Sequence, residues 1–140
     1  MSDAAMLAPV FVHVVLVVAL VIATGGGRVA AVQAGEVKLK DIALDSSKWP
    51  GRLRKLGNNY QNQFELPVLF YAAIALLIAT GLADGVALVL AWGFVASRLV
   101  HSFIQVGTNN VVHRLCAFAA GLAALAAMWL WFALRLYVIG

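Results

Sequence analysis

The stretch AAMLAPVFVHVVLVVALVIAT, residues 4–24, decides the fold class, because it holds no charged residue. About 20 apolar residues at about 1.5 Å per residue cross a hydrocarbon core of roughly 30 Å, so we expect a first transmembrane helix here. A secretory signal peptide is the alternative. Asp3 precedes the run without any Lys or Arg, and GGGRVAAVQAG follows it without a clean cleavage site. This context favours a helix that is retained.

Three further apolar runs follow, at residues 66–83, 85–107 and 115–134. The turn GLADG at residues 81–85 and the polar break GTNN at residues 107–110 separate them. Short connections make consecutive helices antiparallel neighbours. The sequence therefore predicts an all-α integral membrane protein, an up-down bundle of four transmembrane helices that forms one domain over residues 1–140.

The composition supports this class, since 64% of the 140 residues are hydrophobic, 11% are charged and the mean hydropathy is +0.94. Soluble domains carry about 45–50% apolar and about 25% charged residues. The net charge is +4. Nine of the ten basic residues lie in the long segment of residues 28–64 or near the connection at residues 107–110, which is on the same side of the membrane, and Arg135 is the exception. By the positive-inside tendency this loop is cytoplasmic and both termini lie outside. The clustering indicates an asymmetric position in a membrane, and we expect no nucleic-acid partner.

Within residues 28–64, the run SSKWP at residues 46–50 predicts a helix start, because a serine hydroxyl can cap free N–H groups and proline is tolerated in the first turn. We expect the second helix to continue through RLRKLGNNYQNQFE into the bilayer. Pro67 should kink it, because the ring removes the hydrogen bond to the Gln63 carbonyl. On the fourth helix, Ala119 and Ala123 belong to a stripe of small residues at spacing four, which we expect to pack against another helix.

Polar residues at helical spacing interrupt these apolar runs. They are Asn58, Asn62 and Glu65 before the second run, Arg98, His101 and Gln105 in the third, and His113 and Arg114 at the start of the fourth. Each of the first two sets shares one helix face. An ionisable residue within a span costs about 2.5–3.5 kcal/mol on insertion scales, so these groups need partners inside the bundle or a wet cavity. The sequence therefore predicts a polar pocket at the cytoplasmic end.

Two interpretations of this pocket stay open. In the structural one, Glu65 and Arg98 neutralise each other as an ion pair, while Asn62 and Gln105 join two helices by a hydrogen bond. In the functional interpretation, Arg114 binds an anionic ligand, because no acidic residue lies near it in sequence. An unpaired guanidinium in a half-buried cavity favours an anion, such as a carboxylate or a thiolate.

The sequence predicts no metal centre. His101 and His113 lack a carboxylate or cysteine at metal-ligand spacing, and one cysteine, Cys116, cannot form a multi-cysteine site.

Three motifs carry a resemblance to a known family: NQFELPVLFY at residues 62–71, RLVHS at residues 98–102 and NNVVHR at residues 109–114. On these motifs the chain resembles the superfamily of membrane-associated proteins in eicosanoid and glutathione metabolism (MAPEG), in its bacterial branch. The likeness covers all four helices. It implies a homotrimer of four-helix subunits in a bacterial inner membrane, with glutathione bound near the cytoplasmic side between neighbouring subunits.

The resemblance also implies roles for particular residues. Asn62 and Glu65 match an Asn-x-x-Glu motif that contacts the glutathione backbone and its amino group. Lys38 stands where an arginine usually holds a glutathione carboxylate. Arg98 and His101 match an Arg-x-x-His motif of the prostaglandin synthase type. The predicted glutathione-binding residues are therefore Lys38, Asn62, Glu65, Arg98 and His101.

Arg114 falls where the family places the arginine that stabilises the glutathione thiolate, so it is the predicted catalytic residue. The implied function is a membrane-bound glutathione transferase or peroxidase, with glutathione as co-substrate and lipophilic electrophiles or peroxides as its other substrates. The chain departs from the family at Asn58, where glutathione-using members carry an arginine, and at Gln105 and Phe118, where they often carry tyrosines. These departures motivate the alternative, a non-catalytic membrane accessory or scaffold protein with the same fold.

Overall fold

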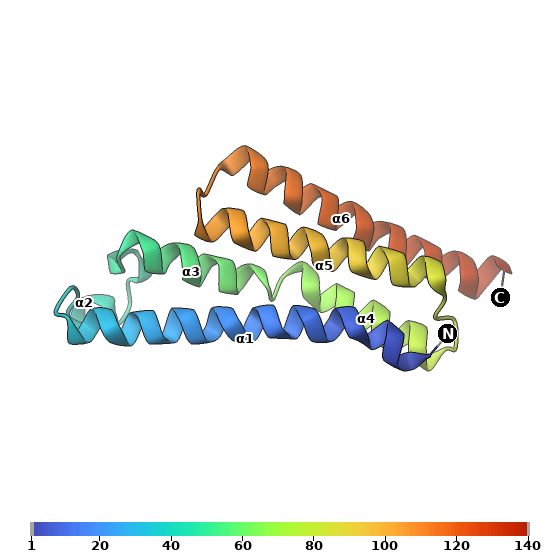
Figure 1. Cartoon of the computed structure of the whole chain (residues 1–140), viewed down its shortest axis with the longest axis horizontal. Coiled ribbons are helices and arrows are strands. Elements are labelled where there is room, and N and C mark those ends of the chain that lie inside the picture. The colour runs from blue at the N-terminus through green and yellow to red at the C-terminus, as the bar shows by residue number, and fades with distance from the viewer. Residues whose placement is uncertain (1, 140) are drawn as a thin grey trace.

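The computed structural model describes residues 2–139, and this part of the chain contains helices and no strand. The elements in chain order are α1 (Asp3–Gln33), α2 (Leu39–Ile42), the 3₁₀-helix η1 (Ser46–Lys48), α3 (Gly51–Asn62), α4 (Leu66–Ala79), α5 (Gly85–Val106), α6 (Val111–Leu134) and the π-helix η2 (Arg135–Ile139) (Figure 1). Four stretches are long and apolar enough to cross a membrane: Asp3–Gln33, Gly51–Ala79, Gly85–Val106 and Val111–Ile139. The chain is therefore an all-α integral membrane protein built on four helices, as the sequence predicts.

The long helices lie side by side, and both termini are at one end of the bundle (Figure 1). α1 packs against α3, α4 and α5, and α6 packs against α4 and α5. Both predicted turns form. The Asp84 carboxylate accepts the N–H of Ala87 at 2.9 Å to begin α5. The Asn110 side chain accepts the N–H groups of Val112 and His113 to begin α6.

The connection between the first two spans is shorter than the predicted loop of residues 28–64. α1 continues to Gln33, so residues 34–50 join it to α3 and hold α2 and η1. Three consecutive glycines, residues 25–27, weaken a helix by about 1 kcal/mol each. Contacts with the connection and α3 offset this cost, because Arg28 lies over the Trp49 ring at 5.1 Å and Gly27 lies against Leu53.

The predicted start of the second helix is also corrected. Asp45, rather than a serine, caps η1 by accepting the N–H of Ser47 at 2.9 Å, and α3 begins after Pro50 with no side-chain cap. The second span is broken rather than kinked, since α3 ends at Asn62 and α4 starts at Leu66. Pro67 lies in the first turn of α4, where its missing N–H costs no helical hydrogen bond.

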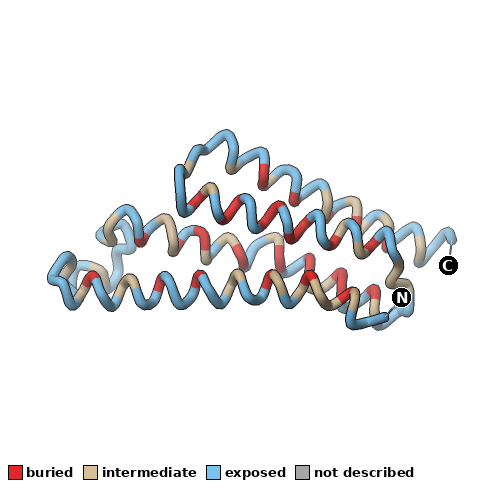
Figure 2. The backbone as a smooth tube through the Cα atoms, in the orientation of Figure 1, coloured by how far each residue is buried: buried red, intermediate tan, exposed pale blue. Residues whose placement is uncertain are grey.

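The apolar core lies in the half of the bundle nearer the termini and is formed by residues of α1, α4, α5 and α6. Buried positions recur along each of the long helices (Figure 2). Phe70 of α4 stacks on Phe94 of α5 at 4.8 Å between ring centroids. Gly121 is on the buried face of α6, whereas Ala119 and Ala123 are exposed. The predicted stripe of small residues therefore packs against α5 at Gly121, which lies against Ser97, and at Ala124, while Ala119 and Ala123 face outward.

Candidate functional site

A buried polar network surrounds the break between α3 and α4. Arg98 of α5 is 1% exposed and donates from Nη2 to the Asn62 carbonyl at 2.9 Å. It also donates to Gln63 Oε1, at 3.4 Å from Nε and 3.3 Å from Nη2. The last carbonyls of a helix lack helical partners and carry partial negative charge, so Arg98 stabilises the end of α3.

Arg98 does not form the ion pair with Glu65 that the structural interpretation predicts. Among residues 2–139, the ion pairs within 4 Å are Arg52–Glu36 and Arg135–Asp84. The backbone and amide oxygens at the break take the place of a carboxylate around this guanidinium.

The guanidinium also orders the proton positions around it. Because arginine only donates, the Gln63 side chain must turn its oxygen toward Arg98. The same oxygen lies 3.1 Å from His13 Nε2, which must then donate. His13 Nδ1 lies 2.6 Å from the Tyr71 hydroxyl and accepts its proton in the neutral ring. The sequence predicts His13 as a packed or hydrogen-bonded neutral histidine, and these contacts agree with it. Gln63 was not among the predicted residues, although it stands four residues after Asn59.

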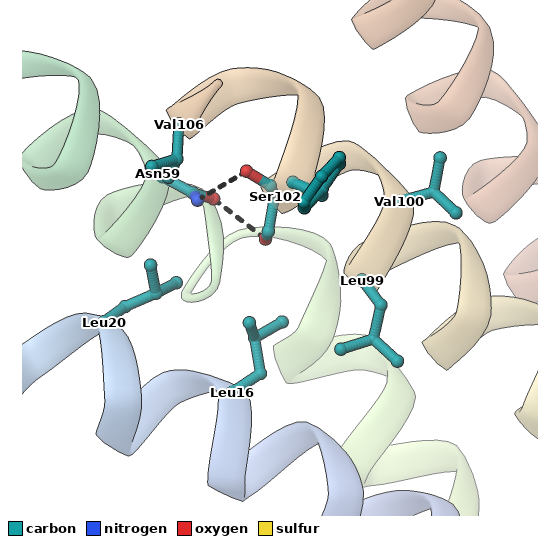
Figure 3. Close-up of a pocket in the computed structure, with 8 residues that line it drawn as sticks. Leu16, Leu20, Asn59, Leu99, Val100, Ser102 and Val106 are labelled. Atoms are coloured by element: carbon teal, nitrogen blue, oxygen red, sulfur yellow. Dashed lines mark hydrogen bonds between the residues drawn. The ribbon is translucent and has the colours of Figure 1, made fainter.

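Asn59 and Ser102 complete the network at its other edge. Ser102 Oγ donates to Asn59 Oδ1 at 3.0 Å, and Asn59 Nδ2 donates to the Ser102 carbonyl at 3.3 Å. The pair forms the polar end of a groove of about 560 Å³ between α1, α3 and α5, walled by leucine, valine and phenylalanine side chains (Figure 3). Apart from this pair, which is satisfied internally, the lining is apolar, as expected of a surface that faces lipid or another helix.

A polar cavity of about 420 Å³ lies on another face of α5. Its volume falls in the usual range of small-molecule sites, about 300–1,000 Å³. Helix α3 and the break contribute Asn58, Gln61, Asn62 and Glu65, α5 contributes His101 and Gln105, and α6 contributes Arg114 and Phe118. The cavity therefore brings together the three regions that the polar spacing singled out.

The charged side chains of the cavity are not paired with each other. Arg114 Nη1 donates to Asn109 Oδ1 at 2.8 Å, and among residues 2–139 no carboxylate lies within 4 Å of it. Glu65 likewise has no cation within 4 Å in that part of the chain. A site that keeps one anion and one cation apart suits a ligand with charges of both signs.

The neutral polar groups of the cavity divide into satisfied and unsatisfied ones. Asn62 Nδ2 donates to Gln105 Oε1 at 3.1 Å, which is the hydrogen bond that the structural interpretation predicts. His101 is 3% exposed, and its buried Nδ1 has no hydrogen-bond partner. An unpaired buried polar atom costs about 1–3 kcal/mol.

The cavity unites four of the six predicted site residues: Asn62, Glu65, His101 and Arg114. Lys38 does not line it, because this exposed residue precedes α2 on the connection between α1 and α3. Arg98 does not line it either, since its guanidinium is turned to the end of α3. Gln61 was not among the predicted residues, although the continuous helix predicted here would have placed it one turn before Glu65.

A family model described as the MAPEG family matches residues 6–134 of the chain. The match includes the whole of α3, α4, α5 and α6 and nearly all of α1. Neither the curated proteins nor the solved structures gave a significant match.

Proposed function

The chain belongs to the MAPEG family, and on this premise we propose that it is a membrane-bound glutathione transferase or peroxidase. Membership supports the coarse class, a membrane protein of a glutathione-related family. The observation that carries the finer proposal is the unpaired Arg114 in the same polar cavity as the unpaired Glu65. A cavity with separate cationic and anionic groups is suited to a small zwitterionic ligand.

The side chains present fit glutathione, which carries carboxylates, an amino group, amides and a thiol. Glu65 would bind the amino group, Asn62 the backbone amides and Arg114 the sulfur. His101 Nδ1, which has no partner in the chain, would supply a further polar contact. Lys38 lies outside the cavity, so it would reach a carboxylate only from a neighbouring subunit, which is consistent with a proposed homotrimer.

Arg114 would act by electrostatics. Its positive charge offsets the negative charge of a thiolate beside it and so favours ionisation of the thiol, whose proton passes to water. The thiolate sulfur would bond to an electrophilic carbon as the leaving group departs with its electron pair. With a peroxide it would bond to one oxygen as the O–O bond breaks and an alcohol leaves, and a second glutathione would then reduce the sulfenic acid to give the disulfide and water. Leu115 and Phe118 give the cavity an apolar wall on α6, along which a lipophilic substrate would arrive from the bilayer.

The proposed orientation follows the charge distribution. The basic residues of the α1–α3 connection and of the first turns of α3 lie at the bundle end opposite the termini (Figure 1). By the positive-inside tendency that end is cytoplasmic, in a bacterial inner membrane. Glutathione would then enter from the cytoplasm.

The alternative, a non-catalytic accessory or scaffold protein, is supported by Asn58 and Gln105. Asn58 lines the cavity at the position where glutathione-using members carry an arginine, and Gln105 is bonded to Asn62. Losing a charge-assisted contact costs about 1.5–3 kcal/mol, or roughly ten- to a hundredfold in affinity. A scaffold would fold, bind no glutathione and tolerate loss of Arg114.

The deciding experiment is the ultraviolet thiolate difference absorbance of detergent-purified protein titrated with glutathione. We expect a saturable signal in the wild type that disappears in Arg114→Ala. The matched control is Arg52→Ala, because Arg52 is exposed, paired with Glu36 and outside the cavity. Sedimentation of each variant reports whether it remains a folded oligomer. A folded wild type without signal would overturn the proposal and favour the scaffold.

A further inference from the structure

A second polar cavity, of about 290 Å³, carries two arginines and no acidic residue in its lining. Arg28 comes from α1, Ser46, Ser47 and Trp49 from the connection, and Arg54 from α3. Neither arginine has a carboxylate within 4 Å among residues 2–139. Arg54 donates to the Ser47 carbonyl at 3.4 Å, which leaves its charge uncompensated. Two like charges in one cavity repel each other, and a bound anion would remove this repulsion.

Arg28 is held in a fitted position. Its guanidinium lies over the Trp49 ring at 5.1 Å. On α3, a Cβ added to Gly57 would come within 3.1 Å of Arg28 Nη2, so the glycine leaves room for this group. Arg28 Nε is buried and has no hydrogen-bond partner. The chain therefore partly dehydrates this cation and leaves a donor unused.

An apolar groove of about 310 Å³ adjoins the same two side chains. Arg28 and Trp49 line it together with Val29, Leu39 and Ile42. One guanidinium and one indole thus stand at the boundary between a cationic cavity and an apolar groove. This combination matches a ligand that joins an anionic group to a hydrocarbon chain.

The position of Arg28 along α1 agrees with such a ligand. No charged residue lies between Asp3 and Arg28. At about 1.5 Å per residue this stretch crosses a hydrocarbon core of about 30 Å, so Arg28 lies where the core ends and the phosphate layer begins. Tryptophan side chains favour the same depth, as Trp49 would have here.

We propose that this cavity and groove bind one anionic phospholipid, with the phosphate between Arg28 and Arg54 and an acyl chain along Val29, Leu39 and Ile42. A soluble anion would leave the groove empty, and a zwitterionic lipid would bring its cationic group toward two arginines. The site stands apart from the proposed glutathione chemistry, since neither arginine lines the other cavity. The two cavities do share Asn58 and Gln61, so the test must separate lipid from glutathione.

The test is native mass spectrometry of the full chain in neutral detergent, titrated with phosphatidylglycerol or with phosphatidylcholine of the same acyl chains. We expect at least about tenfold tighter binding of phosphatidylglycerol, and a loss of about tenfold in Arg28→Gln and in Arg54→Gln. Arg54 is exposed, so its variant should fold even if Arg28→Gln does not. The matched control is Arg52→Gln, which removes the same charge from the same helix at a position paired with Glu36.

The groove is tested by Leu39→Gln, and this variant should fold because Leu39 is 68% exposed. This variant should bind phosphatidylglycerol more weakly by several-fold. An equal loss in Arg52→Gln would overturn the proposal, because general attraction of basic residues to anionic lipid would then explain the binding. Displacement of phosphatidylglycerol by inorganic phosphate or by glutathione would also overturn it and assign the cavity to a soluble anion.

Discussion

Arg98 Nη2 of α5 donates to the backbone carbonyl of Asn62, the last residue of α3, across 2.9 Å. This bond joins a buried cation to the negative end of a helix rather than to a carboxylate. It stabilises the break after α3, and residues on both sides of that break, Asn62 and Glu65, line the polar cavity. Arg98 is therefore a positioning residue for the proposed site.

Arg98→Lys should destabilise the protein by about 1.5–3 kcal/mol, because an ammonium cannot donate in a fixed fork to both the Asn62 carbonyl and Gln63 Oε1. Denaturant unfolding in detergent, followed by circular dichroism, measures the change. Arg52→Lys is the control, because Arg52 is an exposed residue of α3, and it should change stability by less than about 1 kcal/mol. Equal stabilities for the two variants would show that the carbonyl contact is not important.

Glu65→Gln should weaken glutathione binding by about ten- to a hundredfold, because the amide lacks the charge that would pair with the ligand's amino group. Calorimetric titration measures the dissociation constant. A glutathione analogue without the amino group provides the control, since it should bind the wild type and the variant equally. Weakened binding of this analogue by the variant would mean that Glu65 supports the cavity without contacting the amino group.

Asn58→Arg should strengthen glutathione binding by about tenfold or more, since it restores a cation that glutathione-using members carry at a position lining the cavity. The same thiolate titration measures the gain. Asn58 is exposed, so the substitution should leave the fold unchanged. The double variant Asn58→Arg with Arg54→Gln has the net charge of the wild type. It should keep the gain in affinity if the introduced arginine makes a new contact, and lose it if the gain comes only from added positive charge. No gain in affinity would place the glutathione carboxylates elsewhere.

Asp84 should make stability depend on pH in the acid range. Burial raises the pKa of its carboxyl, but the Ala87 N–H, the Trp131 indole and the Arg135 charge together bring the pKa below its usual value. The folded pKa is thus lower than the unfolded value of about 3.9. Its stabilising effect is complete above about pH 4 and is lost as the pH falls through the folded pKa.

The measurement is the thermal unfolding midpoint in detergent from about pH 6 down to about pH 3, compared between the wild type and Asp84→Asn. We expect the wild type to be the more stable protein above about pH 4 and the difference to shrink below it. A difference that stays constant across this range would exclude ionised Asp84 as its source.

Gly121→Ala should destabilise the α5–α6 contact by about 1–3 kcal/mol. The added Cβ would clash with Ser97 Oγ, a hydroxyl that donates to the Phe94 carbonyl at 2.6 Å and would have to leave that bond. Gly93→Ala is the matched control, because its Cβ would meet Ala124 at an ordinary 3.8 Å. Adding Ser97→Ala to Gly121→Ala should restore most of the loss, and failure to do so would place the strain elsewhere.

Local properties of the sequence predict the membrane class, the helical fold and several residues of the candidate site. Transfer of residues 4–24 into lipid depends on their own side chains and hardly on their neighbours, so the absence of charge in that run predicts a span. The spacing of Asn62 and Glu65, and that of His101 and Gln105, assigned these residues to shared faces, and the structure brings both faces to one cavity.

The pairing of the buried polar groups depends on the tertiary structure. Arg98 and His101 are three residues apart on one helix, yet the free carbonyl of Asn62 draws the arginine away from the cavity that His101 lines. α1 continues through its glycines because α3 and Trp49 pack against it. Hydropathy and helical spacing are local properties, whereas the partner of a buried charge depends on where another segment ends and leaves a backbone group unpaired.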